Sequence, residues 1–142
     1  MRDLFSLEGK IALVTGGSVG IGAMIAEGFV NYGAKVYLVA RREEMLKKKQ
    51  EELAKIGSCE YIAADISSVA GIKELAKTYG NREQSLDILV NNAGIIPRAP
   101  ALETSEADWD DTLQVDLKAV FFLSQAAAKY MVRQGSGKII NI

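Results

Sequence analysis

The sequence predicts an α/β fold in which helices cover both faces of a parallel sheet. Short apolar runs alternate with longer amphipathic segments along the chain, the pattern of strands joined by crossover helices. The apolar runs are nearly continuous, as expected for strands that are buried on both faces. A glycine-rich segment separates the first apolar run from the first amphipathic segment, which indicates a tight strand-to-helix turn.

The elements are expected in strict alternation. The expected strands are residues 10–15, 35–40, 60–64, 86–91 and 138–142, each an apolar run bounded by turn residues. The expected helices are residues 20–31, 43–56, 67–79 and 111–133, each with apolar residues at helical spacing.

Helix ends and buried faces follow from individual residues. Gly33 follows the first helix as a C-terminal cap. In the second helix, Met45, Leu46 and Leu53 are expected to face inward. Either Ser67 or Ser68 would cap the third helix, and the segment 105–108 has the pattern of a capping box.

Composition indicates one globular domain covering residues 1–142. Apolar residues make up 49% of the chain and charged residues 25%, close to globular averages. The formal net charge of −1 gives no electrostatic footprint for nucleic acid. A single cysteine, Cys59, and the lack of histidine argue against a disulfide or a metal site. No apolar run approaches the ~18 residues of a membrane span, so we expect a cytoplasmic protein that does not bind a membrane.

The glycine-rich segment from Thr15 to Gly22 has the spacing G-x-x-x-G-x-G. The first N–H groups of a helix are unpaired, and the helix dipole there favours an anion. Glycines without Cβ atoms let a pyrophosphate approach the backbone closely. The segment therefore predicts a phosphate site, and the alternative is a tight turn without a ligand.

The second expected strand ends in Ala40, followed by Arg41 and Arg42, with no acidic residue. In dinucleotide-binding folds an acid at this point binds the ribose of NAD, whereas a basic residue accommodates the 2′-phosphate of NADP. The sequence therefore favours NADP(H) over NAD(H). The alternative is an exposed arginine without a ligand.

Two further strand ends carry candidate site residues. Asp65 follows the third strand, where its carboxylate would either accept from an adenine amino group or cap the next helix. The fourth strand ends in Asn91-Asn92-Ala93-Gly94, whose small residues leave room for a ligand where the strand order reverses. Alone, this tetrapeptide would be only an Asn-rich turn.

The motifs T-G-x-x-x-G-I-G and N-N-A-G, the Asp65 turn and the segment 116–121 resemble the short-chain dehydrogenase/reductase family over essentially the whole chain. The resemblance implies a Rossmann-like, doubly wound sheet with strand order 3-2-1-4-5 and an NAD(P)-dependent oxidoreductase. Residues 4–10 and Ala40-Arg41 are most similar to the 3-oxoacyl reductase branch associated with rhamnolipid synthesis. Sugar-acid dehydrogenases of the same family remain an alternative.

The resemblance also implies roles for individual residues. The implied cofactor-binding residues are Gly16, Ser18, Gly20, Ile21, Gly22, Arg41, Asp65, Ile66, Asn92, Ala93 and Gly94. Arg41 would hold the 2′-phosphate, and Asn91 would stabilise the sheet. Val19 stands where NADP-using relatives often have arginine, and Asp116 stands where the family has the asparagine of its catalytic tetrad.

The family's catalytic Ser and Tyr-x-x-x-Lys lie beyond its fifth strand, and none of the five tyrosines here has a lysine four residues later. We therefore expect the N-terminal, cofactor-binding part of an enzyme, incomplete at its C-terminus and inactive by itself. The alternatives are a non-catalytic nucleotide-binding module and a methyltransferase, the latter disfavoured by N-N-A-G and Arg41. The apolar helix 111–133 implies a dimer or tetramer, and the remaining partner would be a small-molecule substrate.

Overall fold

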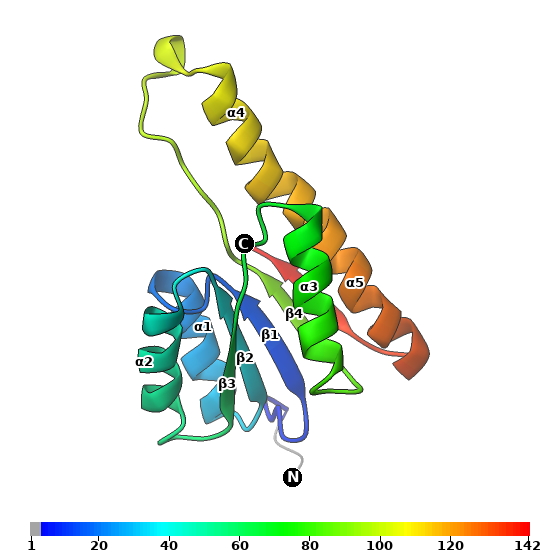
Figure 1. Ribbon diagram of the computed structural model, residues 1–142. Helices are drawn as coiled ribbons and strands as arrows, with labels where there is room; N and C mark the ends of the chain where they lie inside the picture. The colour runs from blue at the N-terminus through cyan, green and yellow to red at the C-terminus, as the bar shows by residue number, and fades with distance from the viewer. Residues whose placement is uncertain (1–3) are drawn as a thin grey trace.

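Five parallel strands form the centre of the molecule, in the order β3-β2-β1-β4-β5 (Figure 1). They are β1 (Ile11–Thr15), β2 (Lys35–Ala40), β3 (Cys59–Ala63), β4 (Ile88–Asn91) and β5 (Lys138–Asn141). The computed structural model describes residues 4–142, so residues 1–3 lie outside the described part of the chain. The order confirms the expected Rossmann-like topology. Strands β2 and β3 are added on one side of β1, and β4 and β5 on the other. This reversal of strand order between β1 and β4 opens a crevice at their carboxyl ends.

Helices cover both faces of this sheet (Figure 1). One face packs against α1 (Gly20–Asn31) and α2 (Glu43–Leu53), and the other against α3 (Val69–Gly80) and α5 (Ala119–Gln134). Successive strand residues enter opposite cores, so that Ala12 and Val14 belong to the first and Leu13 to the second. Burial on both faces explains the nearly continuous apolar strands.

Two details of α2 differ from expectation. Met45 is 36% exposed, whereas Leu46 is fully buried, because a residue one step along a helix is turned by about 100°. α2 ends at Leu53, three residues before the predicted end. Of the two predicted caps of α3, Ser68 is the one observed, and its Oγ accepts a hydrogen bond from the Gly71 N–H at 3.1 Å.

The expected long helix begins earlier and is interrupted. After a 3₁₀ turn at Ala101–Glu103, α4 runs over Glu106–Leu113, a π-helical turn occupies Gln114–Lys118, and α5 follows. The Ser105 Oγ accepts a hydrogen bond from the Asp108 N–H at 3.1 Å and caps α4. The helix therefore begins at the predicted capping box and not at residue 111, where the long helix was expected to begin. Figure 1 shows α4 extending beyond the sheet as an arm. Among residues 4–142, no helix combines the length and apolar character needed to cross a membrane.

Asn91 joins the last two strands to α5. It is 3% exposed, and its Nδ2 donates to Asn141 Oδ1 at 2.9 Å and to Ser124 Oγ at 3.2 Å. The side chain thus links β4 to β5 and α5, as expected of a residue that stabilises the sheet.

Candidate nucleotide-binding site

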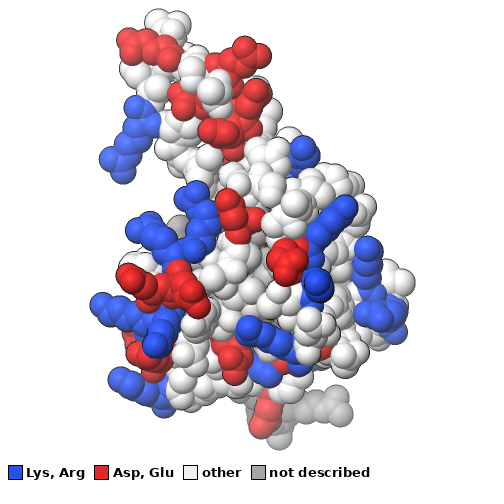
Figure 2. Space-filling view, in the orientation of Figure 1, with Lys and Arg blue, Asp and Glu red and all other residues white. Residues whose placement is uncertain are grey.

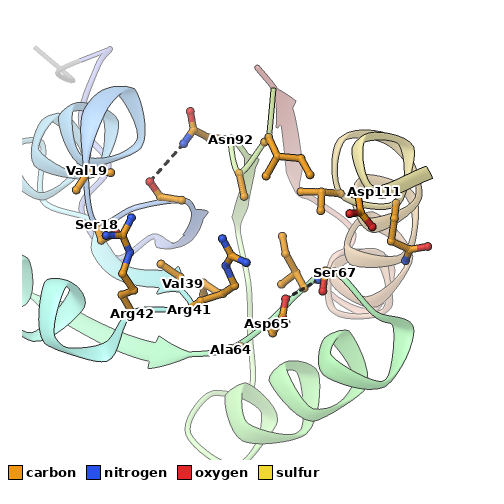
Figure 3. Close-up of a pocket in the computed structure, with 18 residues that line it drawn as sticks. Ser18, Val19, Val39, Arg41, Arg42, Ala64, Asp65, Ser67, Asn92 and Asp111 are labelled. Atoms are coloured by element: carbon orange, nitrogen blue, oxygen red, sulfur yellow. Dashed lines mark hydrogen bonds between the residues drawn. The ribbon is translucent and has the colours of Figure 1, made fainter. Parts of the chain in front are cut away.

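A cavity of about 510 Å³ lies at the carboxyl ends of β1 to β4, bounded on one side by α4 and the π-helical turn (Figure 3). Its volume is in the range of small-molecule and cofactor sites. Five segments line it: Gly16, Ser18 and Val19; residues 39–42; residues 64–67; residues 92–95; and Asp111, Gln114 and Val115. The cavity therefore sits where the strand order reverses, the usual ligand position in open α/β sheets.

The glycine-rich loop connects β1 to α1 and packs closely against its neighbours at Gly16 and Gly22. Gly16 and Gly20 have positive φ values of 64° and 58°, which only glycine adopts readily. A Cβ atom on Gly22 would lie 2.3 Å from the Gly16 carbonyl oxygen and 2.5 Å from Asn92 Nδ2. Side chains at Gly16 or Gly22 would push the loop away from Asn92 at the end of β4.

The first turn of α1 is open to an anion. Its N-cap residue, Val19, makes no side-chain cap, and the turn contains no acidic residue. By contrast, α2 has two glutamates in its first turn, α3 has the Ser68 cap, and α4 has both a cap and acidic residues. Among these four helices, α1 alone leaves its positive end uncompensated.

Thr15 and Asn92 join the carboxyl ends of β1 and β4. The Thr15 hydroxyl donates to the Val90 carbonyl at 3.3 Å and accepts from the N–H groups of Asn92 and Ala93, both at 3.0 Å. Asn92 Nδ2 donates to the carbonyls of Thr15 and Gly16 at 3.1 and 3.4 Å. Sequence reasoning gave no such role to Thr15, although a polar residue closing an apolar strand is a signal for it.

Arg41 and Arg42 supply positive charge at the end of β2. Both are exposed and both line the cavity, and no salt bridge within residues 4–142 involves either of them. Figure 3 shows the Arg41 side chain directed into the cavity and the Arg42 side chain directed toward Ser18. Two unpaired guanidinium groups therefore face the space beside the glycine-rich loop.

The opposite wall of the cavity has the opposite charge. Acidic side chains gather on the α4 arm (Figure 2), and the arm contributes Asp111 to the cavity lining. The α4 arm and the residues just before it carry Glu103, Glu106, Asp108, Asp110 and Asp111. An anionic ligand group is therefore directed to the β2 side of the cavity and away from α4.

Asp65 and Ile66 follow β3 along the cavity floor. Asp65 Oδ1 accepts from the Ser67 N–H at 2.9 Å, and hydrogen bonds from Ser67, with a smaller contribution from the Arg41 charge, lower the pKa of Asp65. Asp65 forms a turn before α3 but does not cap it, because Ser68 does. Its contact with adenine stays a prediction, and Ile66 is buried beside it.

Asp116 lies in the π-helical turn next to the cavity lining. Its Oδ1 accepts from the Ile95 N–H at 2.9 Å, and a Cβ atom on Gly94 would be 3.3 Å from the same oxygen. π-helical turns occur often at functional sites. The observed contact holds the backbone that follows β4, and a catalytic part for Asp116 stays a prediction.

The structure gathers most of the predicted site residues around one cavity. Those that line it are Gly16, Ser18, Arg41, Asp65, Ile66, Asn92, Ala93 and Gly94. Gly20, Ile21 and Gly22 instead form the start of α1 beside it, with Ile21 60% exposed. Asp111 in α4 and Gln114 and Val115 in the π-helical turn gave no recognisable signal in the sequence, because neither α4 as a separate helix nor the turn was anticipated.

These observations fit a dinucleotide. The Gly22 position admits no Cβ atom, the α1 amides are uncompensated, and unpaired guanidiniums face the same cavity. Within residues 4–142, no group of three or more His, Cys, Asp or Glu side chains is arranged to hold a metal ion.

The sheet order and the site at its switch point define a Rossmann-like α/β protein. The model of the family described as short chain dehydrogenase matches residues 10–142. The chain belongs to this family.

Curated relatives include a gluconate 5-dehydrogenase of Gluconobacter oxydans, 43% identical over 145 residues, a match that covers 99% of this chain and 55% of the relative. A rhamnolipids biosynthesis 3-oxoacyl-[acyl-carrier-protein] reductase of Pseudomonas aeruginosa is 40% identical, covering 100% of this chain and 57% of the relative. The chain thus spans about half the length of the curated relatives it matches.

Solved structures give the same result. The Pseudomonas aeruginosa RhlG/NADP active-site complex matches with a TM-score of 0.94 and 40% identity, covering 99% of this chain and 57% of that one. The L-sorbose reductase from Gluconobacter frateurii, complexed with NADPH and L-sorbose, matches with a TM-score of 0.91 and 31% identity, covering 96% and 53%.

Proposed function

We propose that residues 1–142 form the NADP(H)-binding unit of a short-chain oxidoreductase that interconverts a carbonyl compound and an alcohol. The observation that carries this proposal is the unpaired Arg41 at the end of β2, directed into the cavity beside the glycine-rich loop. A guanidinium there suits a 2′-phosphate, whereas an acid would suit an unmodified ribose. The similar structures that carry NADP or NADPH support the same choice.

Each part of the cavity would hold one part of the cofactor. The glycine-rich loop and the first turn of α1, including Gly20 to Gly22, would receive the pyrophosphate. Arg41 would bind the 2′-phosphate, and Asp65 and Ile66 would flank the adenine. The segment from Asn92 to Gly94 would contact the ribose next to the nicotinamide, and Asp116 would keep that segment in place through Ile95. The bound nicotinamide would supply the hydride chemistry.

The proposed substrate is a small carbonyl or alcohol compound of the 3-oxoacyl thioester or sugar type. Both classes are named among the relatives, as 3-oxoacyl reductase and as gluconate dehydrogenase. Hydride transfer to a carbonyl requires a proton donor, and no tyrosine in residues 1–142 has a lysine four residues later. We therefore expect residues 1–142 to bind NADPH without turning it over.

The cofactor assignment is tested with Arg41→Ala in the full-length protein. Loss of a charge-assisted contact to phosphate should raise the Kd for NADPH more than about tenfold and leave the Kd for NADH nearly unchanged. Isothermal titration calorimetry with both cofactors measures the two effects. Equal losses for NADPH and NADH would contradict the assignment.

Turnover is tested by assaying NADPH oxidation with 3-oxoacyl thioesters and keto sugars. Residues 1–142 should show no more activity than their Gly22→Val variant, and the full-length protein should show turnover. A full-length protein that binds NADPH but reduces no carbonyl would favour the alternative of a non-catalytic nucleotide-binding module.

We further propose that the chain self-associates through α4 and α5. Trp109, Leu113, Leu117 and Phe121 recur at intervals of four residues and are 60%, 39%, 63% and 62% exposed. Such an apolar stripe is typical of a helix that packs against a partner. Light scattering of the full-length protein should show a dimer or tetramer that Phe121→Glu weakens. A monomeric wild-type protein at micromolar concentration would contradict the proposal.

A further inference from the structure

The loop side of the cavity carries no charge of its own next to the end of β2. Val19 lines the cavity and is 50% exposed, but its side chain is apolar. Ser18 beside it offers one hydroxyl group. A phosphate held between the loop and β2 must therefore obtain its cationic side-chain partners from the β2 side.

A single guanidinium does not satisfy a terminal phosphate. A phosphomonoester carries a charge of about −1.5 to −2 at pH 7 and has three strong acceptor oxygens. One arginine engages two of these oxygens in a bidentate pair and neutralises one charge. Arg41 alone would leave one oxygen and part of the charge without a cationic partner from the protein, and a second cationic side chain beside it would supply one.

Arg42 is placed to be that donor. It is the N-cap residue of α2, with φ −87° and ψ 101°, and its side chain makes no capping hydrogen bond. It lines the cavity together with Arg41 and Ser18, and in Figure 3 it is directed toward Ser18 while Arg41 enters from the β2 end. The Arg42 guanidinium therefore lies near the loop residue Ser18, and the Arg41 guanidinium points toward the interior of the cavity (Figure 3).

The surrounding charges leave Arg42 free for a ligand. Among residues 4–142, its acidic neighbours Glu43 and Glu44 form no salt bridge with it and do not line the cavity. Glu43 instead accepts a hydrogen bond from the Tyr61 hydroxyl at 3.3 Å. Arg42 is therefore an exposed cation that faces the cavity and forms no salt bridge with the two neighbouring glutamates, so it is available to bind an anion.

We propose that Arg42 is a second specificity-determining residue for the 2′-phosphate of NADP(H), acting with the Ser18 hydroxyl opposite Arg41. The inference rests on the proposed function, because it assumes that the cavity holds NADP(H). In this proposal, Arg41 and Arg42 both contribute to the preference for NADPH over NADH.

The test compares NADPH and NADH binding by calorimetry in the full-length protein. Arg42→Ala should raise the Kd for NADPH about tenfold and change the Kd for NADH less than about twofold. Arg42→Lys should fall between wild type and Arg42→Ala for NADPH, because it keeps the charge but loses the bidentate fork. The double variant Arg41→Ala/Arg42→Ala should bind both cofactors with Kd values within about twofold of each other.

Lys47→Ala is the matched control, since Lys47 is an exposed cation of α2 outside the cavity lining. It should change neither Kd, and circular dichroism should show that every variant is folded. If Arg41→Ala affects NADPH selectively but Arg42→Ala affects both cofactors equally or neither, the role of Arg42 is refuted and the proposed function stands. If the wild-type protein binds neither cofactor or prefers NADH, the proposed function fails and the inference fails with it.

Discussion

The charged residues at the two ends of the strands differ in their pairing. We call the side where the strands begin the amino edge of the sheet and the side where they end the carboxyl edge. At the carboxyl edge, Arg41 and Arg42 face the cavity without a salt bridge among the described residues. At the amino edge, Lys35 pairs with Glu83, and Lys10 lies 3.6 Å from Asp87. Strand β2 thus begins with a paired charge, Lys35, and is followed by two charges, Arg41 and Arg42, that have no salt bridge among residues 4–142.

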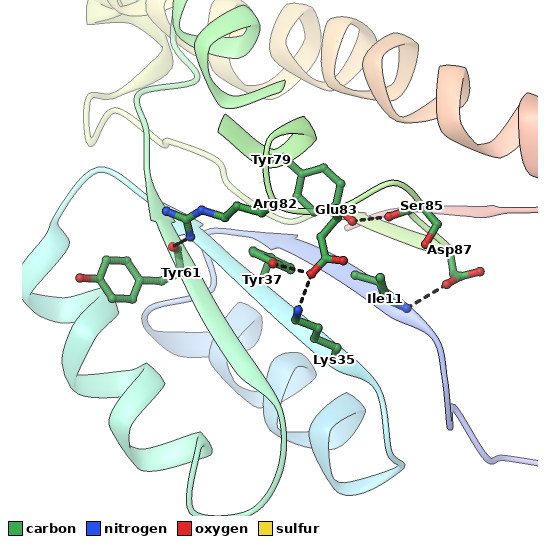
Figure 4. A network of polar contacts seen from close by, with 9 residues as sticks. All are labelled: Ile11, Lys35, Tyr37, Tyr61, Tyr79, Arg82, Glu83, Ser85 and Asp87. Atoms are coloured by element: carbon green, nitrogen blue, oxygen red, sulfur yellow. Dashed lines mark hydrogen bonds and ion pairs between the residues drawn. The ribbon is translucent and has the colours of Figure 1, made fainter. Parts of the chain in front are cut away.

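Figure 4 shows how completely the amino edge is paired. Glu83 Oε1 accepts hydrogen bonds from Lys35 and from the Tyr37 hydroxyl, the latter at 2.6 Å. The hydrogen bond with Glu83 raises the pKa of Lys35. Burial alone would raise the pKa of Glu83, but its two donors outweigh this and lower it.

The amino-edge contacts extend to the neighbouring strands. Tyr79 donates to the Ser85 carbonyl at 2.6 Å, and Asp87 Oδ2 accepts from the Ile11 N–H at 2.9 Å. Groups that are satisfied within the fold contribute to stability, whereas groups left open at the other edge are available to a ligand. We therefore expect variants at the amino edge to change stability, and variants at the carboxyl edge to change binding.

The largest effect on binding should come from Gly22→Val. The new side chain would collide with the Gly16 carbonyl and with Asn92, since even a Cβ atom would lie 2.3 and 2.5 Å away from them. The loop would have to move, which we expect to raise the Kd for NADPH more than about a hundredfold and to cost about 1–3 kcal/mol of stability. Calorimetry and urea denaturation measure the two effects.

Gly28→Ala is the control for this prediction. Gly28 lies in the same helix, α1, and a Cβ atom there meets nothing within 4 Å. Alanine should raise the free energy of unfolding by up to about 1 kcal/mol through helix propensity and leave the Kd unchanged. If Gly28→Ala weakens NADPH binding as much as Gly22→Val does, the loop contact is not the cause.

The next largest effect should come from Thr15→Val. Thr15 lies at the carboxyl ends of the strands, but its hydroxyl is hydrogen-bonded within the fold, so its substitution should change both stability and binding. It is buried at the carboxyl edge, yet its hydroxyl is fully engaged with β4. Valine keeps the shape but leaves the N–H groups of Asn92 and Ala93 without their acceptor, so the free energy of unfolding should fall by about 1–3 kcal/mol. NADPH binding should weaken as well, because Asn92 and Ala93 line the cavity.

Thr15→Ser, which keeps the hydroxyl, should retain most of the stability and affinity lost by Thr15→Val in urea denaturation and calorimetry. A serine variant as weak as valine would assign the effect to packing of the methyl group instead.

The sequence predicted the strand–helix order and eight of the eighteen residues that line the cavity, because these depend on local signals. Buried strands appear in the sequence as apolar runs, so the residues that follow each run can be identified. Because the cavity lies where the strand ends meet, Gly16, Arg41, Asp65 and Asn92 were expected there and do line it. The π-helical turn at Gln114–Lys118 was not predicted, because an extra residue in a helix has no compositional signature. The direction of Arg42 and the contacts of Thr15 depend on neighbours distant in the sequence.

A smaller effect, on stability alone, is expected for Glu83→Gln. The pKa of Glu83 is lowered from its ordinary value of 4.5, so its contribution is present above pH 4.5 and is lost as the pH falls through the folded-state pKa. The pKa of Lys35 is raised above 10.5, so the pair also weakens as the pH rises beyond that value.

Between these limits, Glu83→Gln should lower the free energy of unfolding by about 1 kcal/mol, and the difference from wild type should shrink below pH 4.5. Urea denaturation across this pH range measures it, and calorimetry should show an unchanged Kd for NADPH. A Glu83 variant that keeps its stability but loses NADPH affinity would break the division between the two edges.

The smallest effect is expected for Asp116→Asn, which separates a hydrogen bond from a charge at the carboxyl edge. Asp116 Oδ1 accepts from the Ile95 N–H at 2.9 Å, and an asparagine carbonyl in the same place accepts equally well. Stability should therefore change by less than about 0.5 kcal/mol, and the Kd for NADPH by less than about twofold. Asp116→Ala removes the acceptor and should cost about 1 kcal/mol, with a weaker Kd because residues 92–95 line the cavity. Thermal denaturation and calorimetry on the pair of variants decide the point: equal losses in asparagine and alanine would mean that the carboxylate charge, rather than its hydrogen bond to Ile95, supports the site.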